Sequence, residues 1–139
     1  MLNENEIIRA LCLHLQATDH IIEQHCDAGV HGIDLIARTK DGGKRLLIEV
    51  KGGTSTRPDS SRYNKPYTSS QVFDVVAKGF HQILQRHLDF SSDCRHDFGF
   101  AFPDHPVFHK YVSPIVPVAK MMKIRLFAVN DKGIVSELI

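Results

Sequence analysis

Two acids and one lysine interrupt segments that otherwise have the composition of buried strands. Asp34 stands in GIDLIART, and Glu49 and Lys51 stand in LLIEVKGG, among leucine, isoleucine and valine. Charged side chains are rarely buried unless they are paired or have a function. These three positions therefore either face water as ordinary surface charges or form a reaction centre.

The link between the two segments decides how the charges are placed. Asp41-Gly42 is a strong signal for a tight hairpin turn. With these residues at the loop centre, position 40 pairs with position 43, and counting outward sets Asp34 opposite Glu49. Directly opposed side chains share a face, with Cβ atoms about 4.5–5.5 Å apart. Lys51 lies two residues beyond Glu49 and projects from the same face.

The other face of the hairpin provides a check on this register. The count assigns to it only apolar residues: Ile33, Leu35, Ala37, Leu46, Ile48 and Val50. A hairpin that packs one face on a core has this composition. A three-residue loop with a bulge at Gly43 would shift the pairing by one, but the uniform apolar face favours the simple count.

The pairing of Asp34 with Glu49 predicts a particular chemistry. Two carboxylates this close repel each other unless a cation lies between them. Mg²⁺ prefers such hard oxygen ligands and keeps waters or substrate phosphate oxygens, and we expect Mn²⁺ to substitute for it. A neighbouring ammonium, here Lys51, can hold the attacking water while the metal stabilises charge on the phosphate. The alternative is a solvated outer face with ordinary cross-strand charge pairs.

The elements that must position these charges follow from hydrophobic periodicity. Helical spacing predicts helices over 4–17, 70–88 with Ser69 or Ser70 as N-cap, and part of 106–122, where Pro114 and Pro117 interrupt it. Strands are expected at 20–27, 32–39, 44–51, 97–103, 123–129 and 134–138. This order predicts an α/β fold with a central mixed β-sheet flanked by helices, in three α/β/α layers.

GIDL, a hairpin and IEVKGG together resemble the bipartite signature of the PD-(D/E)xK nuclease superfamily. That superfamily has the restriction-endonuclease-like fold and includes archaeal Holliday junction resolvases. Its acid on the second core strand and its Glu-x-Lys on the third match Asp34 and Glu49-Val50-Lys51. The order of the family's core elements covers roughly residues 4–103. The proline of the family's name is absent, since Ile33 precedes Asp34.

The resemblance implies further site residues. It implies that the backbone carbonyl of Val50 holds the metal together with Asp34 and Glu49. Glu6, with Glu4 as a weaker substitute, matches a glutamate that approaches the metal from the first helix in some members. The alternative for Glu6 is a capping box with Asn3.

A polar residue on the helix after the third strand is also common in this superfamily. Gln71 matches it here and is a predicted catalytic residue; its alternative is an exposed helix face. Lys78 lies seven residues later on nearly the same stripe. We predict that Lys78 contacts nucleic acid, and an exposed helix face is its alternative as well.

A polar segment of the chain, 52–69, is longer than most loops of compact domains, which indicates a functional or disordered loop. Its cations alternate with aromatic residues, which suits contact with phosphates and stacking on bases. The predicted nucleic-acid-binding residues of this loop are Arg57, Arg62, Tyr63 and Lys65, with Tyr67 close by. The alternative is a surface loop without a partner.

Length and composition limit the number of domains and the kinds of partner and location that we expect. The chain has 139 residues, enough for a single domain over 1–139, and a formal charge of +1 that favours no particular partner. Three cysteines without CxxC spacing fit reduced thiols. The sequence begins without a signal-peptide pattern and has no apolar run of about 20 residues, so we expect a cytoplasmic protein and no membrane partner.

These observations predict a Mg²⁺-dependent nuclease. The expected substrate is DNA, cut as by an endonuclease of restriction, repair or recombination. The expected protein partner is a second copy of the chain, in a homodimer, or a partner subunit. One alternative is a nuclease-fold subunit of a larger assembly that binds nucleic acid or protein without cutting. A second is a structural or interaction protein whose charged face is only solvated.

Overall fold

One mixed sheet organises the protein, of which the computed structural model describes residues 1–25, 32–90 and 95–139. Its strands lie in chain order, antiparallel at both edges and parallel from β3 to β5. They are β1 (His20–His25), β2 (Leu35–Thr39), β3 (Arg45–Val50), β4 (His96–Pro103), β5 (Ile124–Val129) and β6 (Val135–Glu137). The predicted α/β class with a central mixed sheet is confirmed.

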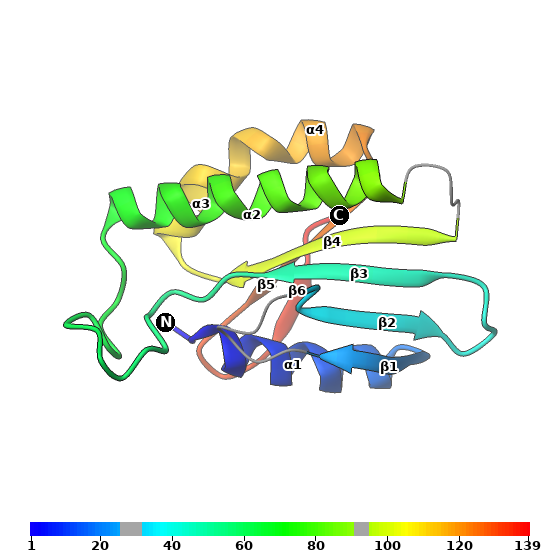
Figure 1. Ribbon diagram of the computed structural model, residues 1–139, viewed down its shortest axis with the longest axis horizontal. Helices are drawn as coiled ribbons and strands as arrows, with labels where there is room; N and C mark the ends of the chain where they lie inside the picture. The colour runs from blue at the N-terminus through cyan, green and yellow to red at the C-terminus, as the bar shows by residue number, and fades with distance from the viewer. Residues whose placement is uncertain (26–31, 91–94) are drawn as a thin grey trace.

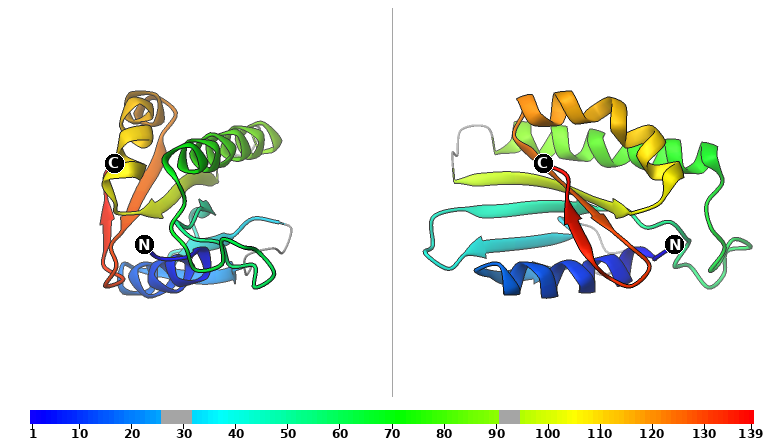
Figure 2. Two further views of the ribbon diagram at one scale, coloured as in Figure 1. Left: turned by 90° about the vertical axis from the view of Figure 1, so that its left-hand side faces the viewer. Right: turned by 180° about the vertical axis from the view of Figure 1, so that it is seen from behind.

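Helices cover both faces of this sheet. Helix α1 (Glu4–Ala17) lies on one face. On the other face lie α2 (Ser69–Asp89), α3 (Pro106–Val112), the 3-10 turn η1 (Ser113–Ile115) and α4 (Val116–Met121) (Figure 1). The sheet curls, so that β5 and β6 run steeply across the view in which β2, β3 and β4 are nearly horizontal (Figure 1, Figure 2).

Each face of the sheet has its own apolar core. On the α1 side, Ile7, Leu11 and Leu15 pack with the hairpin residues Leu35, Ala37, Leu46, Ile48 and Val50. The prediction of an apolar hairpin face is therefore confirmed for five of its six members. Ile33 was assigned to this face wrongly, because it packs against the core on the α2 side.

The core on the α2 side fixes the helix above the candidate site. Val72, Val76, Phe80 and Ile83 recur at helical spacing along α2 and are buried. They share a cluster with Leu47 of β3 and with the β4 residues Phe98, Phe100 and Phe102. This packing holds α2 over the charged face of β3.

The hairpin between β2 and β3 has the predicted register. Leu35 pairs with Ile48 and Arg38 with Arg45, so the same count sets Asp34 opposite Glu49. Strand β2 begins at Leu35, three residues after its predicted start. The reason is that the Asp34 carboxylate accepts the hydrogen bond of the Val50 N–H, at 2.8 Å, and thereby takes the place of a backbone partner.

Both long helices begin with a capping box. In α1 it joins Asn3 and Glu6, as the alternative for Glu6 anticipated. In α2 the N-cap is Thr68, and the predictions of Ser69 or Ser70 are wrong by one or two residues. The Thr68 N–H donates to the Gln71 side chain at 2.8 Å, which completes a Thr-x-x-Gln box.

The remaining boundaries agree with the predictions to within one residue, and residues 26 and 27 of the strand predicted over 20–27 lie outside the described residues. The first helix is confirmed at its predicted bounds, and the third helical segment is interrupted by η1 at Pro114, with Pro117 in the first turn of α4. Cys12 is a free thiol, whereas Cys26 and Cys94 lie outside the described residues. Within the described ranges, no helix has the length and apolar character needed to cross a membrane.

Candidate functional site

The structure brings Asp34, Glu49 and Lys51 together at the end of β3. Lys51 Nζ lies 2.9 Å from Glu49 Oε1, and Asp34 Oδ2 accepts from the N–H of Val50, between these two residues in the chain. The arrangement follows from the hairpin register and from alternation along β3, because residues 49 and 51 project from the same side. A turn signal and a two-residue spacing are thus enough to bring these groups together.

A third acid, Glu4 at the start of α1, completes the cluster. The charge of Glu4 acts on Asp34 and on Lys51, and the charges of Lys51 and Glu49 act on Glu4. Gly52 makes this approach possible: a Cβ at that position would overlap the backbone nitrogen of Glu4. The Gly53 N–H also donates to the Leu2 carbonyl at 2.9 Å and ties the loop after β3 to the start of α1.

Glu6 and Gln71, the two other acids or amides predicted at the site, are engaged in the helix caps. Glu6 Oε2 accepts from the Asn3 N–H at 2.8 Å, and Gln71 Oε1 accepts from the Thr68 N–H. The predicted metal role of Glu6 and the catalytic role of Gln71 remain predictions. Glu4, not Glu6, is the glutamate of α1 that interacts with the cluster.

Burial governs the electrostatics of the cluster. Asp34 and Glu49 are each 7% exposed, so the reading of a solvated outer face is wrong. Burial, followed by the charge of Glu49, raises the pKa of Asp34 to about 8, against the opposing effect of the Val50 N–H. Asp34 therefore holds a proton at neutral pH in the absence of a bound cation.

Lys51 stays charged within this cluster. Burial by itself lowers the pKa of a lysine, but the charge and the hydrogen bond of Glu49 outweigh it, and the pKa of Lys51 is raised. For Glu4, burial raises the pKa and the charge of Lys51 opposes the rise. An ammonium beside crowded carboxyl groups is thus a fixed feature of the site.

The loop after β3 folds back on itself beside the cluster. Bridges join Thr54 to Pro66 and Ser55 to Tyr63, and the Tyr67 N–H donates to the Gly53 carbonyl at 2.8 Å. Burial raises the pKa of Tyr67, and the charge of Glu4 adds to this rise, which indicates that the phenol lies near the acids. The loop is therefore held at the site by its own backbone.

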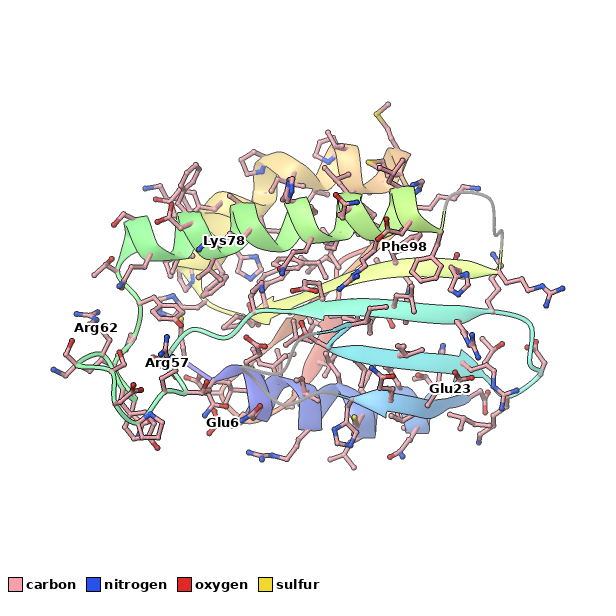
Figure 3. All side chains as sticks on the ribbon, in the orientation of Figure 1. Glu6, Glu23, Arg57, Arg62, Lys78 and Phe98 are labelled. Carbon is pink, nitrogen blue, oxygen red and sulfur yellow. The ribbon has the colours of Figure 1, made fainter. Side chains whose placement is uncertain are left out.

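The predicted nucleic-acid contacts are exposed to different degrees. Arg57, Lys65 and Lys78 are exposed, Tyr63 is 43% exposed, and Arg62 donates from Nη2 to the Pro66 carbonyl at 2.8 Å. Arg57 lies 3.8 Å from Asp59 in an exposed ion pair, which is expected to be weak. Figure 3 shows Arg57, Arg62 and Lys78 toward the end of the molecule that also carries Glu6, away from Glu23 and Phe98.

The donor chemistry of the cluster suits a hard divalent cation. Asp34, Glu49 and Glu4 offer carboxylate oxygens. Burial, and then the repulsion of neighbouring carboxylates, raises the pKa values of Asp34 and Glu4, and a bound cation would offset this repulsion. The present side-chain positions are those of an ion pair between Glu49 and Lys51. Across the described ranges, no three His, Cys, Asp or Glu side chains are already arranged as a metal site.

Comparison with known proteins gives little further information. No protein-family model matches the sequence, and no curated protein matches it. Among solved structures, the chain is similar to an fdxN element excision controlling factor protein from Anabaena variabilis, at 12% identity and a TM-score of 0.49. The match covers 96% of this chain and 95% of that one. At this TM-score the likeness supports no conclusion about fold or function.

Proposed function

We propose that the protein is a metal-dependent nuclease of the PD-(D/E)xK type, which hydrolyses phosphodiester bonds of nucleic acid, with DNA as the expected substrate. One observation carries the proposal: two nearly buried carboxyl groups, of Asp34 just before β2 and of Glu49 on β3, lie beside a lysine ammonium. Such a cluster costs folding free energy and brings no obvious structural benefit. Strongly shifted pKa values of this kind concentrate at functional sites.

The restriction-endonuclease-like fold is part of the same proposal. The observed order runs α1, β1, β2, β3, α2 and β4, which is the order that the superfamily's core implies over roughly 4–103. Asp34 precedes the second of these strands, and Glu49 lies on the third with Lys51 just beyond it. This order of elements, with Asp34 directly before the second strand and Glu49 on the third, supports the proposal.

Each residue of the cluster has a role in the proposed reaction. Asp34, Glu49 and the Val50 carbonyl are the proposed Mg²⁺ ligands, with Glu4 in the place first given to Glu6. The ion, when bound, offsets charge on the phosphate and acidifies its water. Lys51 positions the attacking water and places a positive charge beside the negative charge that develops on the phosphate oxygens. The loop residues Arg57, Arg62, Tyr63 and Lys65 contact the backbone of the substrate.

The test is a nicking assay on supercoiled plasmid DNA with Mg²⁺, with Mn²⁺ and with EDTA. We expect nicking with either metal and none with EDTA. Lys51→Ala removes the ammonium and should slow nicking by about 100-fold or more. Lys132→Ala, in the turn before β6, is the matched control and should cut like the wild type. Equal nicking by the Lys51→Ala and wild-type proteins would contradict the assigned role.

A non-cleaving subunit that binds nucleic acid is the second candidate. The observation that favours it is the Glu49–Lys51 ion pair, which occupies a carboxylate that a metal would need. This candidate predicts DNA binding that weakens with salt, without cleavage under any metal condition. The absence of both cleavage and binding would leave a structural or interaction protein, in which the buried cluster has no chemical role, as the remaining candidate.

A further inference from the structure

We propose that a pocket on α2 beside Lys51 is a phosphate subsite for the nucleic-acid strand, adjoining the cleavage site. The pocket has a volume of about 490 Å³ and is lined by Lys51, Ala77, Lys78, His81 and Gln82. The inference rests on the proposed function, because it assigns a second contact for the same substrate. It adds His81 and Gln82, which the sequence did not single out.

Gly79 leaves room for the Lys51 side chain to pass beneath α2, which packs over the sheet. A Cβ at this position would lie 2.5 Å from the Phe100 ring and 3.3 Å from Lys51 Cγ. The glycine therefore lets α2 pack closely on β3 and β4 while the lysine side chain passes beneath the helix. Lys51 is 18% exposed along its side chain and forms part of the pocket wall.

The helix gathers the polar side chains of the pocket. Lys78, His81 and Gln82 are related by three and four residues, so they lie next to one another on one side of α2. All three are exposed, whereas Gly79 and Phe80 between them are buried. The small side chain of Ala77 leaves room between these groups.

The charge of the pocket favours an anion. Among the described residues that line it, none has a carboxylate; Lys78, His81 and Gln82 offer donors, and Lys51 adds the charge of an ammonium that is paired with Glu49. Its volume lies within the range of about 300–1,000 Å³ that is common for ligand pockets. A phosphodiester group is the anion that the proposed function brings to this place.

Lys51 separates two regions of opposite charge. On one side it pairs with Glu49 at 2.9 Å, near Asp34 and Glu4. On the other side it borders the pocket with Lys78 and His81. A strand that places its scissile phosphate at Lys51 can therefore place a neighbouring phosphate against α2, where Figure 3 shows Lys78 above the start of the loop.

The experiment measures binding apart from cleavage. A fluorescein-labelled single-stranded DNA is titrated with full-length protein in EDTA at several salt concentrations. Lys78→Ala should weaken binding about threefold to tenfold and reduce the slope of log affinity against log salt by about 0.7, as for one lost phosphate contact. Gln82→Glu, which keeps the side-chain size and adds a negative charge, should weaken binding at least as much.

Each variant has a matched control on another helix. Lys120→Ala on α4 removes an exposed lysine, and Gln16→Glu on α1 adds an exposed acid; both should bind DNA like the wild type. Circular dichroism melting curves verify that all four variants fold. Equal effects of Lys78→Ala and Lys120→Ala, or of Gln82→Glu and Gln16→Glu, would overturn the subsite.

The outcomes separate this inference from the proposed function. Cleavage by the wild type with no specific loss in the pocket variants would refute the subsite and retain the nuclease. Weakened binding in the pocket variants without cleavage by the wild type would support the subsite and refute the nuclease. A wild type that neither binds nor cuts DNA would refute both.

Discussion

At the scale of single residues, Asp34 connects fold and function. Its carboxyl oxygen accepts from the Val50 N–H, which ends the pairing of β2 with β3. Its burial, and then its position beside Glu49, makes its ionisation unfavourable. The folded protein holds a proton on Asp34 that the unfolded chain releases above about pH 4. Stability is therefore lost as the pH rises from the ordinary pKa of an aspartate toward about 8.

This loss predicts that Asp34→Asn stabilises the metal-free protein, and more so at high pH. Each unit of pKa difference corresponds to about 1.4 kcal/mol, so we expect the variant to gain at least about that much relative to the wild type between pH 5 and pH 9. Thermal melting in EDTA across this range measures the difference. The amide keeps an oxygen that can accept from the Val50 N–H.

Asp74→Asn on α2 is the control for this prediction, because Asp74 is exposed and lies outside the cluster. Its melting temperature should follow that of the wild type at every pH. If Asp34→Asn destabilises the protein equally at pH 5 and pH 9, Asp34 is not the buried carboxyl group with a raised pKa described above.

The sequence alone does not determine whether Glu4 or Glu6 faces the cluster. Both lie in the first turn of α1, about 200° apart around the helix axis. Which of them faces the cluster depends on how α1 docks, and Gly52 determines that contact from a distant part of the chain. By contrast, the sequence was enough to place Asp34, Glu49 and Lys51 together. The Asp41-Gly42 turn sets Asp34 opposite Glu49, and the two-residue alternation of a strand puts Lys51 on the same side as Glu49.

At the scale of elements, the contact between the start of α1 and the end of β3 builds the site. Gly52 lies against the backbone of Asn3 and Glu4, and Gly53 lies against the side chain of Met1. The two glycines after Lys51 thus allow one helix end to meet one strand end. This close approach explains the pair of glycines in the sequence.

Gly52→Ala should therefore damage both stability and the site. The added Cβ meets backbone atoms that cannot rotate away, so we expect a loss of about 1–3 kcal/mol, measured by urea unfolding. Gly43→Ala is the control, since its added Cβ would meet only side-chain atoms, those of Asp41 at 3.0 Å and of Thr39 at 3.7 Å. Equal stability of the two variants would contradict the docking of α1 described above.

Element boundaries were predictable where local chemistry decides them. The capping box sets the start of α1, and the Asp41-Gly42 turn sets the register of the hairpin. The start of β2 was not predictable, because it depends on the Asp34 side chain reaching the Val50 N–H across the sheet. The N-cap of α2 was misassigned because three hydroxyl residues in a row, Thr68 to Ser70, are all suitable.

At the scale of the whole molecule, the sheet brings separate parts of the chain to one end. The start of α1, the end of β3, the loop after it and the N-terminal half of α2 meet there (Figure 1, Figure 2). The class of fold followed from periodicity and element order. The curl of the sheet and the pocket on α2 did not, because both arise from packing between elements.

The most direct test of the central claim is the anomalous X-ray density of a crystal soaked with Mn²⁺. The account predicts one strong peak between the carboxylates of Asp34 and Glu49, with Lys51 Nζ moved away from Glu49. The same soak of Glu49→Gln crystals should give a weaker peak or none. A wild-type crystal with Mn²⁺ bound elsewhere and the Glu49–Lys51 ion pair unchanged would contradict the account.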